Sequence, residues 1–227
     1  MEDNSTTWAY DWVGNRNPSS NTYNCVDELN PGSGYVYDKL GNLEYKPDSS
    51  STPRTRYYYT DDNLLKQVDD VTESGTGSAT MTWDADQQRV KISQAGWDWR
   101  FIYDPTASIP AVLFADTDLY GTCYYVGEPG GELIARQQGS TWHYYHFDAL
   151  GSTRLLTDAG GSVTDRYSYD PWGSVISHDR YAGSIDQPYQ YVGQLGYYMH
   201  YQDPDFNLMQ LGVRFYDPTI GRFTQRD

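Results

Sequence analysis

The chain has 227 residues and carries 31 acidic against 16 basic side chains, so its formal net charge at pH 7 is -15. A protein with this charge repels phosphate backbones and anionic lipids, and we therefore expect no nucleic-acid partner. No run of about 18 apolar residues is present, so we expect no membrane insertion either. The acidic and polar start of the chain lacks the apolar stretch of a secretory signal, and no export route is visible.

Tyrosine dominates the apolar part of the composition. Aromatic residues make up 16% of the chain, and 23 residues are Tyr, whereas disordered chains are poor in aromatic residues. Tyr, Trp and Thr favour the pleated, half-buried surface of a β-sheet. Because hydrophobic residues reach only 38% in total, Tyr rings must supply much of the core while their hydroxyl groups stay hydrogen-bonded.

The chain is an array of ten copies of one repeat, which is clearest in residues 35–43. That copy reads aromatic, any residue, aromatic, Asp, two residues, Gly, and then an apolar residue, and weaker copies keep only part of this pattern. Five of the nine intervals between the anchoring aromatic residues are 22 residues long, a regularity that chance does not produce. In chain order, the predicted aromatic ladder consists of Tyr10, Tyr37, Tyr59, Trp83, Tyr103, Tyr125, Phe147, Tyr169, Tyr191 and Tyr216.

Each copy is predicted to form a β-hairpin. The Tyr-x-Tyr alternation places two aromatic rings on one face of a strand, and Asp then opens a turn by binding the backbone amide two residues later. Gly, three residues after Asp, fits the left-handed conformation that closes a type I turn with a bulge. Turns are expected near residues 38–41, 60–63, 148–151 and 170–173. The predicted turn-forming residues are Asp11, Gly14, Asp38, Gly41, Asn63, Asp148, Gly151, Asp170, Gly173, Asp217 and Gly221.

These hairpins predict an all-β fold. One isolated hairpin is marginally stable, so antiparallel hairpin repeats of about 22 residues should pair edge to edge into a twisted, curling β-sheet ribbon or solenoid. The chain contains 21 Gly and 11 Pro, and no segment keeps a 3.6-residue period over three turns. We therefore expect no helical domain.

Three motifs in the last third of the chain carry a family resemblance: residues 146–154, 166–173 and 211–223. Together with the repeat, they resemble the YD repeats of the Rhs (rearrangement hot spot) proteins, which bacterial polymorphic toxins, insecticidal toxin complexes and animal teneurins share. On this basis, residues 1–141 are predicted to hold degenerate YD repeats and residues 142–227 to resemble the Rhs-associated core. The two parts should form one continuous β architecture.

The resemblance implies a β-shell that encloses or presents a toxin, with an aspartyl autoprotease at the end of the core. Arg226 and Asp227 match the start of the family's first catalytic motif, Arg-Asp-Pro-x-Gly. The rest of that motif and the second catalytic Asp are not among the 227 residues. Because a lone carboxylate cannot share a proton with a second one, no catalytic site is complete and we expect the chain not to be an enzyme.

No metal or cofactor site is predicted. The acidic pairs lack the spacing of a calcium loop, and the four histidines lack zinc spacing; these are His143, His146, His178 and His200. The sequence leaves open whether Cys25 and Cys123 form a disulfide, with free or buried thiols favoured. Asn4 begins a glycosylation sequon.

Three functions are compatible with this pattern. The first is a segment of an Rhs-type shell, the second is a self-assembling extracellular fibre subunit, and the third is a carbohydrate-binding β module. Trp97 and Trp99 should share one strand face and could stack on glycans, although a role in the core or shell lining is favoured. The expected partners are further copies of the chain or flanking Rhs sequence, and the expected location is extracellular or at a bacterial cell surface.

Overall fold

A computed structural model describes residues 9–11, 15, 23–24, 28–29, 34–47, 54–70, 77–104, 106, 111–129, 132–202 and 206–226. The predictions made for Asn4, Gly14, Cys25 and Asp227 lie outside these residues. Within them the chain is all-β, as predicted, and its one helical element is a short 3-10 turn, η2, at Gly193–Leu195. No helix in this part of the chain is long and apolar enough to cross a membrane.

Fourteen strands form one sheet in which every strand pairs with its neighbours in the sequence. All of these pairings are antiparallel, and β1 and β14 are the two edges of an open sheet. The strands are β1 (Val36–Tyr37), β2 (Leu43–Pro47), β3 (Arg54–Tyr59), β4 (Leu65–Asp70), β5 (Gly77–Trp83), β6 (Arg89–Gln94), β7 (Trp97–Asp104), β8 (Ala111–Thr117), β9 (Gly121–Gly127), β10 (Leu133–Gln138), β11 (Thr141–Phe147), β12 (Thr153–Asp158), β13 (Val163–Tyr169) and β14 (Val175–Arg180).

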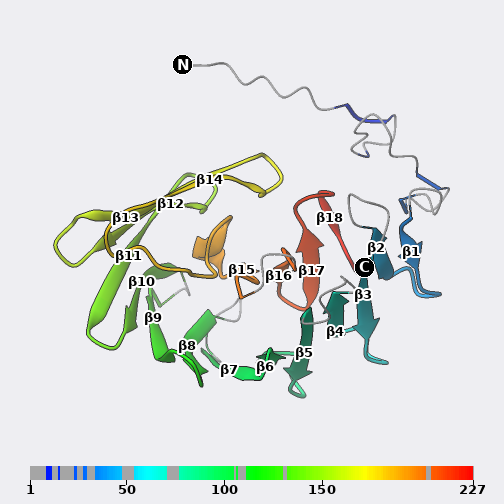
Figure 1. Cartoon of the computed structure of the whole chain (residues 1–227), viewed down its shortest axis with the longest axis horizontal. Coiled ribbons are helices and arrows are strands. Elements are labelled where there is room, and N and C mark those ends of the chain that lie inside the picture. The colour runs from blue at the N-terminus through cyan, green and yellow to red at the C-terminus, as the bar shows by residue number, and fades with distance from the viewer. Residues whose placement is uncertain are drawn as a thin grey trace.

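The end of the chain leaves this sheet after β14. Residues 181–202 and 206–226, which we call the plug, contain a second sheet of four strands. In Figure 1 the large sheet curves around the plug, which occupies its concave side. The four strands are β15 (Tyr198–Met199), β16 (Met209–Leu211), β17 (Arg214–Asp217) and β18 (Arg222–Phe223).

The alternation of side chains along each strand explains how the core forms. In β7, Trp99 and Phe101 are buried whereas the flanking Arg100 and Ile102 are exposed, so every second residue points to the concave face. Residues of the plug complete the same apolar cluster, and they are Tyr189, Tyr198, Phe206, Leu208 and Phe215. The plug is therefore part of the hydrophobic core of the sheet.

Candidate functional site at the concave face and its plug

The turns at one rim of the sheet are built by Asp in a repeated way. In the first complete copy, Asp38 Oδ1 accepts hydrogen bonds from the amides of Leu40 (2.8 Å) and Asn42 (2.9 Å). Gly41 has a φ of 85°, a conformation that costs Gly little. The bond to the second amide, four residues after Asp, was not foreseen, and it ties the turn to the returning strand.

The other predicted turns repeat the hydrogen bonds of Asp38 or the positive φ of Gly41. Asp148 and Asp170 each accept the same two amide bonds, and Gly151 and Gly173 have φ values of 88° and 97°. Asn63 replaces Gly with a φ of 65°.

Two further turns extend the pattern at the two ends of the described chain. Asp11 Oδ1 accepts the amide of Asn15 at 2.7 Å, and Gly221 in the plug has a φ of 69°.

One turn of this kind was missed. Asp158 accepts the amides of Gly160 (2.8 Å) and Ser162 (2.9 Å), and Gly161 has a φ of 82°. This turn joins β12 to β13 and lies on the opposite rim from the repeat turns. The same Asp-x-x-Gly spacing was present in the sequence, but its position outside the 22-residue period concealed it.

The ladder residues bind the neighbouring hairpin through their polar ends. Tyr59 Oη donates to the carbonyl of Leu43 at 2.9 Å, and Tyr169 Oη donates to the carbonyl of Thr153 at 2.8 Å. The same link runs from Trp83 Nε1 to Leu65 O (2.8 Å) and from Tyr103 Oη to Arg89 O (2.9 Å). In each case the acceptor begins a returning strand or the bulge beside it, so these bonds fix how one hairpin sits on the next.

Tyr125 departs from the predicted ladder. The turn after it begins at Glu128, whose amide donates to Glu132 O at 2.9 Å, so Gly127 occupies the position of Phe147. Tyr125 is therefore equivalent to Tyr145, two residues earlier in the repeat. A shift of two residues keeps a side chain on the same face of a strand, which is why the aromatic pattern did not reveal it.

The last two ladder residues lie in the plug and do not continue the large sheet. Tyr191 Oη donates to Pro171 O at 2.9 Å, and Tyr216 lies on β17 with its ring 5.6 Å from Phe223. Near the other end, Tyr10 is 52% exposed and packs 6.3 Å from Trp172.

The plug binds hairpins that precede it by more than 150 residues. The amide of Leu43 donates to Thr224 O at 2.7 Å, and Gln225 Nε2 donates to Asn63 O at 2.8 Å. Arg226 lies against the first complete turn, because a Cβ added to Gly41 would be 2.9 Å from its Cδ. The end of the described chain is thus fixed to the rim formed by the earliest complete hairpins.

A buried ion pair strengthens this attachment. Asp217, predicted as a turn residue, has a fully buried side chain, and its Oδ2 lies 2.5 Å from Lys46 Nζ. Its Oδ1 accepts the amide (2.8 Å) and hydroxyl (2.6 Å) of Thr219 in the turn that follows β17. Lys46 also donates to Thr219 Oγ1 at 3.0 Å. No local sequence signal could have paired Lys46 with Asp217, because 171 residues separate them.

Asp165 holds the start of the plug. Its buried carboxylate accepts Ser184 Oγ at 2.6 Å and lies 2.8 Å from His178 Nε2. A nucleophilic triad requires the hydroxyl to bind the imidazole, whereas here the hydroxyl and the imidazole both bind the carboxylate. The cluster is therefore structural, and it fastens residue 184 to β13 and β14.

The concave face also contains a cavity of about 420 Å³ between β6–β10 and the plug. Trp97 and Trp99 line it from the same face of β7, but Trp99 is only 6% exposed and offers little surface for a sugar ring.

Polar and ionisable side chains also line this cavity. Arg136 is buried, and it donates to Gln138 Oε1 (2.6 Å) and to the carbonyl of Asp186 (3.2 Å). Cys123 at the same cavity is a free thiol whose pKa is raised by burial. Within the described ranges, no group of three potential metal ligands is close enough to hold an ion.

Comparison with known proteins explains this architecture. The family model of the teneurin YD-shell matches residues 73–227. The chain belongs to the teneurin YD-shell family. The resemblance to Rhs and YD-repeat proteins is thereby confirmed, and the chain is a structural YD-shell segment.

Curated relatives of this YD-shell segment are bacterial and much longer. The tRNA3(Ser)-specific nuclease WapA of Bacillus spizizenii is 26% identical over 236 residues, covering 97% of this chain and 9% of that protein. The double-stranded DNA deaminase toxin A of Burkholderia cenocepacia is 26% identical over 200 residues, covering 85% of this chain and 12% of that protein. The chain thus spans about a tenth of the length of these relatives.

Solved structures share the YD-shell fold. A structure of the Photorhabdus luminescens Tc holotoxin pore matches with a TM-score of 0.66 and 17% identity, covering 97% of this chain and 12% of that one. A crystal structure of TcdB2–TccC3 matches with a TM-score of 0.56 and 17% identity, covering 85% and 12%. At this identity the likeness shows a common fold.

Proposed function

We propose that this chain is a segment of an Rhs-type β-shell that surrounds a toxin polypeptide. The observation that carries the proposal is the return of the plug across the concave face to the earliest complete hairpins, through Thr224, Gln225 and the Lys46–Asp217 pair. This return fixes Arg226 at the rim of the sheet, beside Gly41. A polypeptide that follows residue 227 would start from a fixed point at this rim.

The sheet supports a role as a wall that needs further strands. Among the residues that the structure describes, its fourteen strands remain open at β1 and β14. Its inner face carries apolar and aromatic residues, and these form one hydrophobic cluster with residues of the plug. We therefore propose that flanking YD repeats, or further copies of the chain, complete the enclosure.

The catalytic and cellular parts of the proposal rest on the family. We propose that the chain itself is not an enzyme and that any autoprotease requires residues beyond Arg226 and Asp227. We also propose an extracellular or cell-surface location in a bacterium, since the relatives named above are bacterial and one is named a toxin.

Protease protection in the full-length natural protein tests the shell. Polypeptide that follows residue 227 should resist proteinase K in the unaltered protein and become cleavable in Lys46→Met, because this substitution removes the cation that binds Asp217. Arg100→Gln is the matched control, since Arg100 pairs with Asp118 on the exposed face and should keep the protection. Equal cleavage in all three proteins would contradict the proposal.

A further inference from the structure

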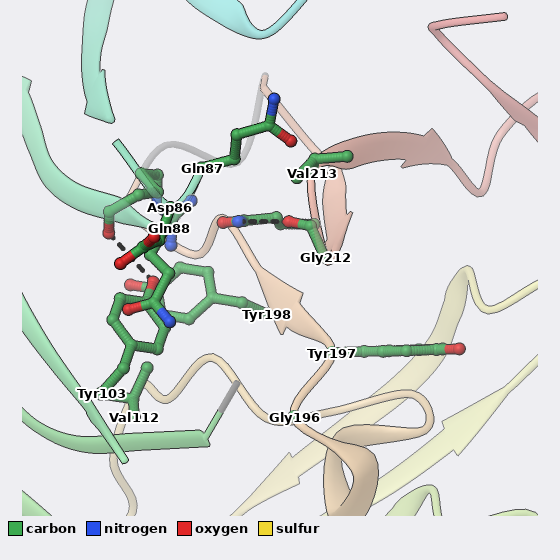
Figure 2. A pocket seen from close by; sticks show the side chains of 12 residues that line it. Asp86, Gln87, Gln88, Tyr103, Val112, Gly196, Tyr197, Tyr198, Gly212 and Val213 are labelled. Atoms are coloured by element: carbon green, nitrogen blue, oxygen red, sulfur yellow. Dashed lines mark hydrogen bonds between the residues drawn. The ribbon is translucent and has the colours of Figure 1, made fainter. Parts of the chain in front are cut away.

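Cavities of different size lie between the large sheet and the plug. One of about 110 Å³ lies beside the turn at residues 86–88, and Figure 2 shows Tyr103 and Tyr198 on one side of it and Gly212 and Val213 across from them. The cavity between β6–β10 and the plug measures about 420 Å³. Ligand pockets in proteins measure about 300–1,000 Å³. Of these two cavities, the second therefore has room for a ligand with a six-membered ring and its substituents.

Two exposed aromatic rings line the larger cavity at the rim opposite the repeat turns. Trp97 begins β7 and is 39% exposed, and Tyr120, in the turn between β8 and β9, is 61% exposed. The backbone of Tyr120 is held in place, because its amide donates to Thr117 Oγ1 (2.7 Å) and its carbonyl accepts Gln138 Nε2 (2.9 Å). The cavity thus presents aromatic surface to water, part of it on a turn that side chains fix.

Polar side chains also line this cavity, and they include Gln94, Arg136, Gln138, Asp186 and Gln202. Gln138 Nε2 donates to Tyr120 O, and Gln202 Nε2 donates to Tyr198 Oη at 2.6 Å. Each amide nitrogen carries two N–H groups, so one bond does not exhaust its capacity to donate. Asp186 pairs with Arg180 through Oδ1, and its side chain is 63% exposed, so its carboxylate can still accept hydrogen bonds from a ligand. The lining therefore offers donors and acceptors together.

This lining disfavours three classes of ligand. The net charge of -15 and the carboxylate of Asp186 oppose an anion, and the guanidinium of Arg136 opposes a cation. A hydrocarbon would take the amide, guanidinium and carboxylate groups out of water without bonding to them. A neutral ligand with several hydroxyl groups meets none of these penalties.

We infer that this cavity binds a carbohydrate, with the face of one sugar ring against Trp97 or Tyr120 and the hydroxyl groups bonded to the polar lining. The face of an aromatic ring carries the negative part of its quadrupole and attracts the weakly positive C–H groups of a sugar ring. Hydroxyl groups donate and accept, so they match planar amide, guanidinium and carboxylate groups. The cavity lies within one copy of the chain, so this site does not depend on the shell proposal.

Binding of the protein to an array of neutral glycans, followed by saturation-transfer NMR with the glycans that bind, tests the inference. The unaltered protein should bind at least one class of glycan, and irradiation of its aromatic protons should saturate the C–H protons of one sugar ring most strongly. Trp97→Ala and Tyr120→Ala should each weaken binding about tenfold or more. Because both side chains are exposed, both variants should keep the fold, which circular dichroism checks.

Tyr144→Ala is the matched control for Trp97→Ala. Tyr144 is as exposed as Trp97, at 39%, but it lies on the outer face of the sheet, between the buried residues His143 and Tyr145 of β11. This variant should bind the same glycan as tightly as the unaltered protein. An equal loss of binding in Tyr144→Ala and Trp97→Ala would show that the sugar does not bind in the cavity, and would overturn the inference.

Cyclohexanol distinguishes a carbohydrate site from a merely apolar cavity, because it has a six-membered ring with a single hydroxyl group. At the concentration at which the glycan gives a saturation-transfer signal, cyclohexanol should give none. A cyclohexanol signal as strong as that of the glycan would overturn the inference, since the polar lining would then contribute nothing. Failure to bind any neutral glycan on the array, or binding that survives unchanged in both aromatic variants, would overturn it as well.

Discussion

Lys46 and Asp217 form an ion pair across 171 residues, with Nζ and Oδ2 2.5 Å apart. The two partners differ in burial, since the Asp217 side chain is fully buried and that of Lys46 is 20% exposed. The pair joins β2, near the start of the large sheet, to β17 in the plug. The two residues therefore differ in what their removal leaves behind.

Lys46→Met should destabilise the protein more than Asp217→Asn. The first change leaves a buried carboxylate without a cation and should cost about 3–5 kcal/mol of unfolding free energy. The second leaves Lys46 able to reach water and keeps an acceptor for Thr219, so we expect about 1–3 kcal/mol. Urea unfolding measures both, and Arg100→Gln, which breaks exposed ion pairs, should cost less than either change. Equal losses in the two variants would show that the pair is not buried.

Gly173→Ala should cost more than Gly161→Ala, although both residues close an Asp-x-x-Gly turn at positive φ. A Cβ on Gly173 would lie 2.7 Å from Tyr191 Cδ1 and 2.9 Å from Met209 Cε, whereas a Cβ on Gly161 meets nothing within 4 Å. Gly161→Ala should lose about 1 kcal/mol from backbone strain, and Gly173→Ala about 1–3 kcal/mol more from displaced plug residues. Chemical denaturation of both variants provides the measurement, and equal losses would mean that the plug does not pack against the 170–173 turn.

Tyr169→Phe should remove one link between hairpins. The hydroxyl of Tyr169 donates to Thr153 O at 2.8 Å, and its loss should cost about 0.5–1.5 kcal/mol. Tyr144→Phe is the control, since Tyr144 is 39% exposed and its hydroxyl can reach water in the folded state. Denaturation midpoints at matched m-values measure both changes. A loss at Tyr144 as large as that at Tyr169 would contradict the role of the ladder.

His200 should make the protein lose stability as the pH falls below about 6.5. Burial, and secondarily the charge of Arg89, hold the pKa of His200 well below its ordinary value of 6.5. Between the folded and unfolded pKa values only the unfolded chain binds the proton, so stability rises with pH by up to about 1.4 kcal/mol per unit. His200→Leu should therefore show a flatter stability profile between pH 5 and 7. Parallel profiles for the two proteins would contradict a neutral, buried imidazole.

We propose that the open sheet edges lead to self-association that increases with salt. The edge strand β14 exposes Ile176 (67%) and Val175 (41%), and its outer backbone groups can pair with the first strand of another copy. A net charge of -15 opposes association, and salt screens that charge beyond about 10 Å at 0.1 M. Light scattering and electron microscopy at low and high salt check this, and Ile176→Lys should weaken the association. A monomer at both salt concentrations would exclude the fibre reading.

The repeating part of the fold could be read from the sequence because its causes are local. Asp38 and Gly41 specify a turn within five residues, and the alternating aromatic residues specify which face of each strand is buried. Such local rules gave the all-β class, the antiparallel order and the family. They could not detect the two-residue shift at Tyr125, because both registers bury the same face.

The plug could not be predicted, because its position depends on contacts that are distant in sequence. Tyr191 and Tyr216 continue the spacing of the earlier ladder residues, yet both lie in the plug and not in the large sheet. The burial of Arg89 was equally hidden, since it depends on Tyr198 more than a hundred residues later. Sequence periodicity describes a strand and its neighbour, and it contains no information on which segment crosses the sheet.

The order of the chain also has a consequence for synthesis. Each hairpin of the large sheet pairs residues that are close in sequence, so it can form soon after it emerges from the ribosome. The contacts of Thr224 and Gln225 with Leu43 and Asn63 can form only after translation of nearly all 227 residues. The concave face consequently stays accessible to other molecules until residues 181–226 have been translated, because these residues cover it.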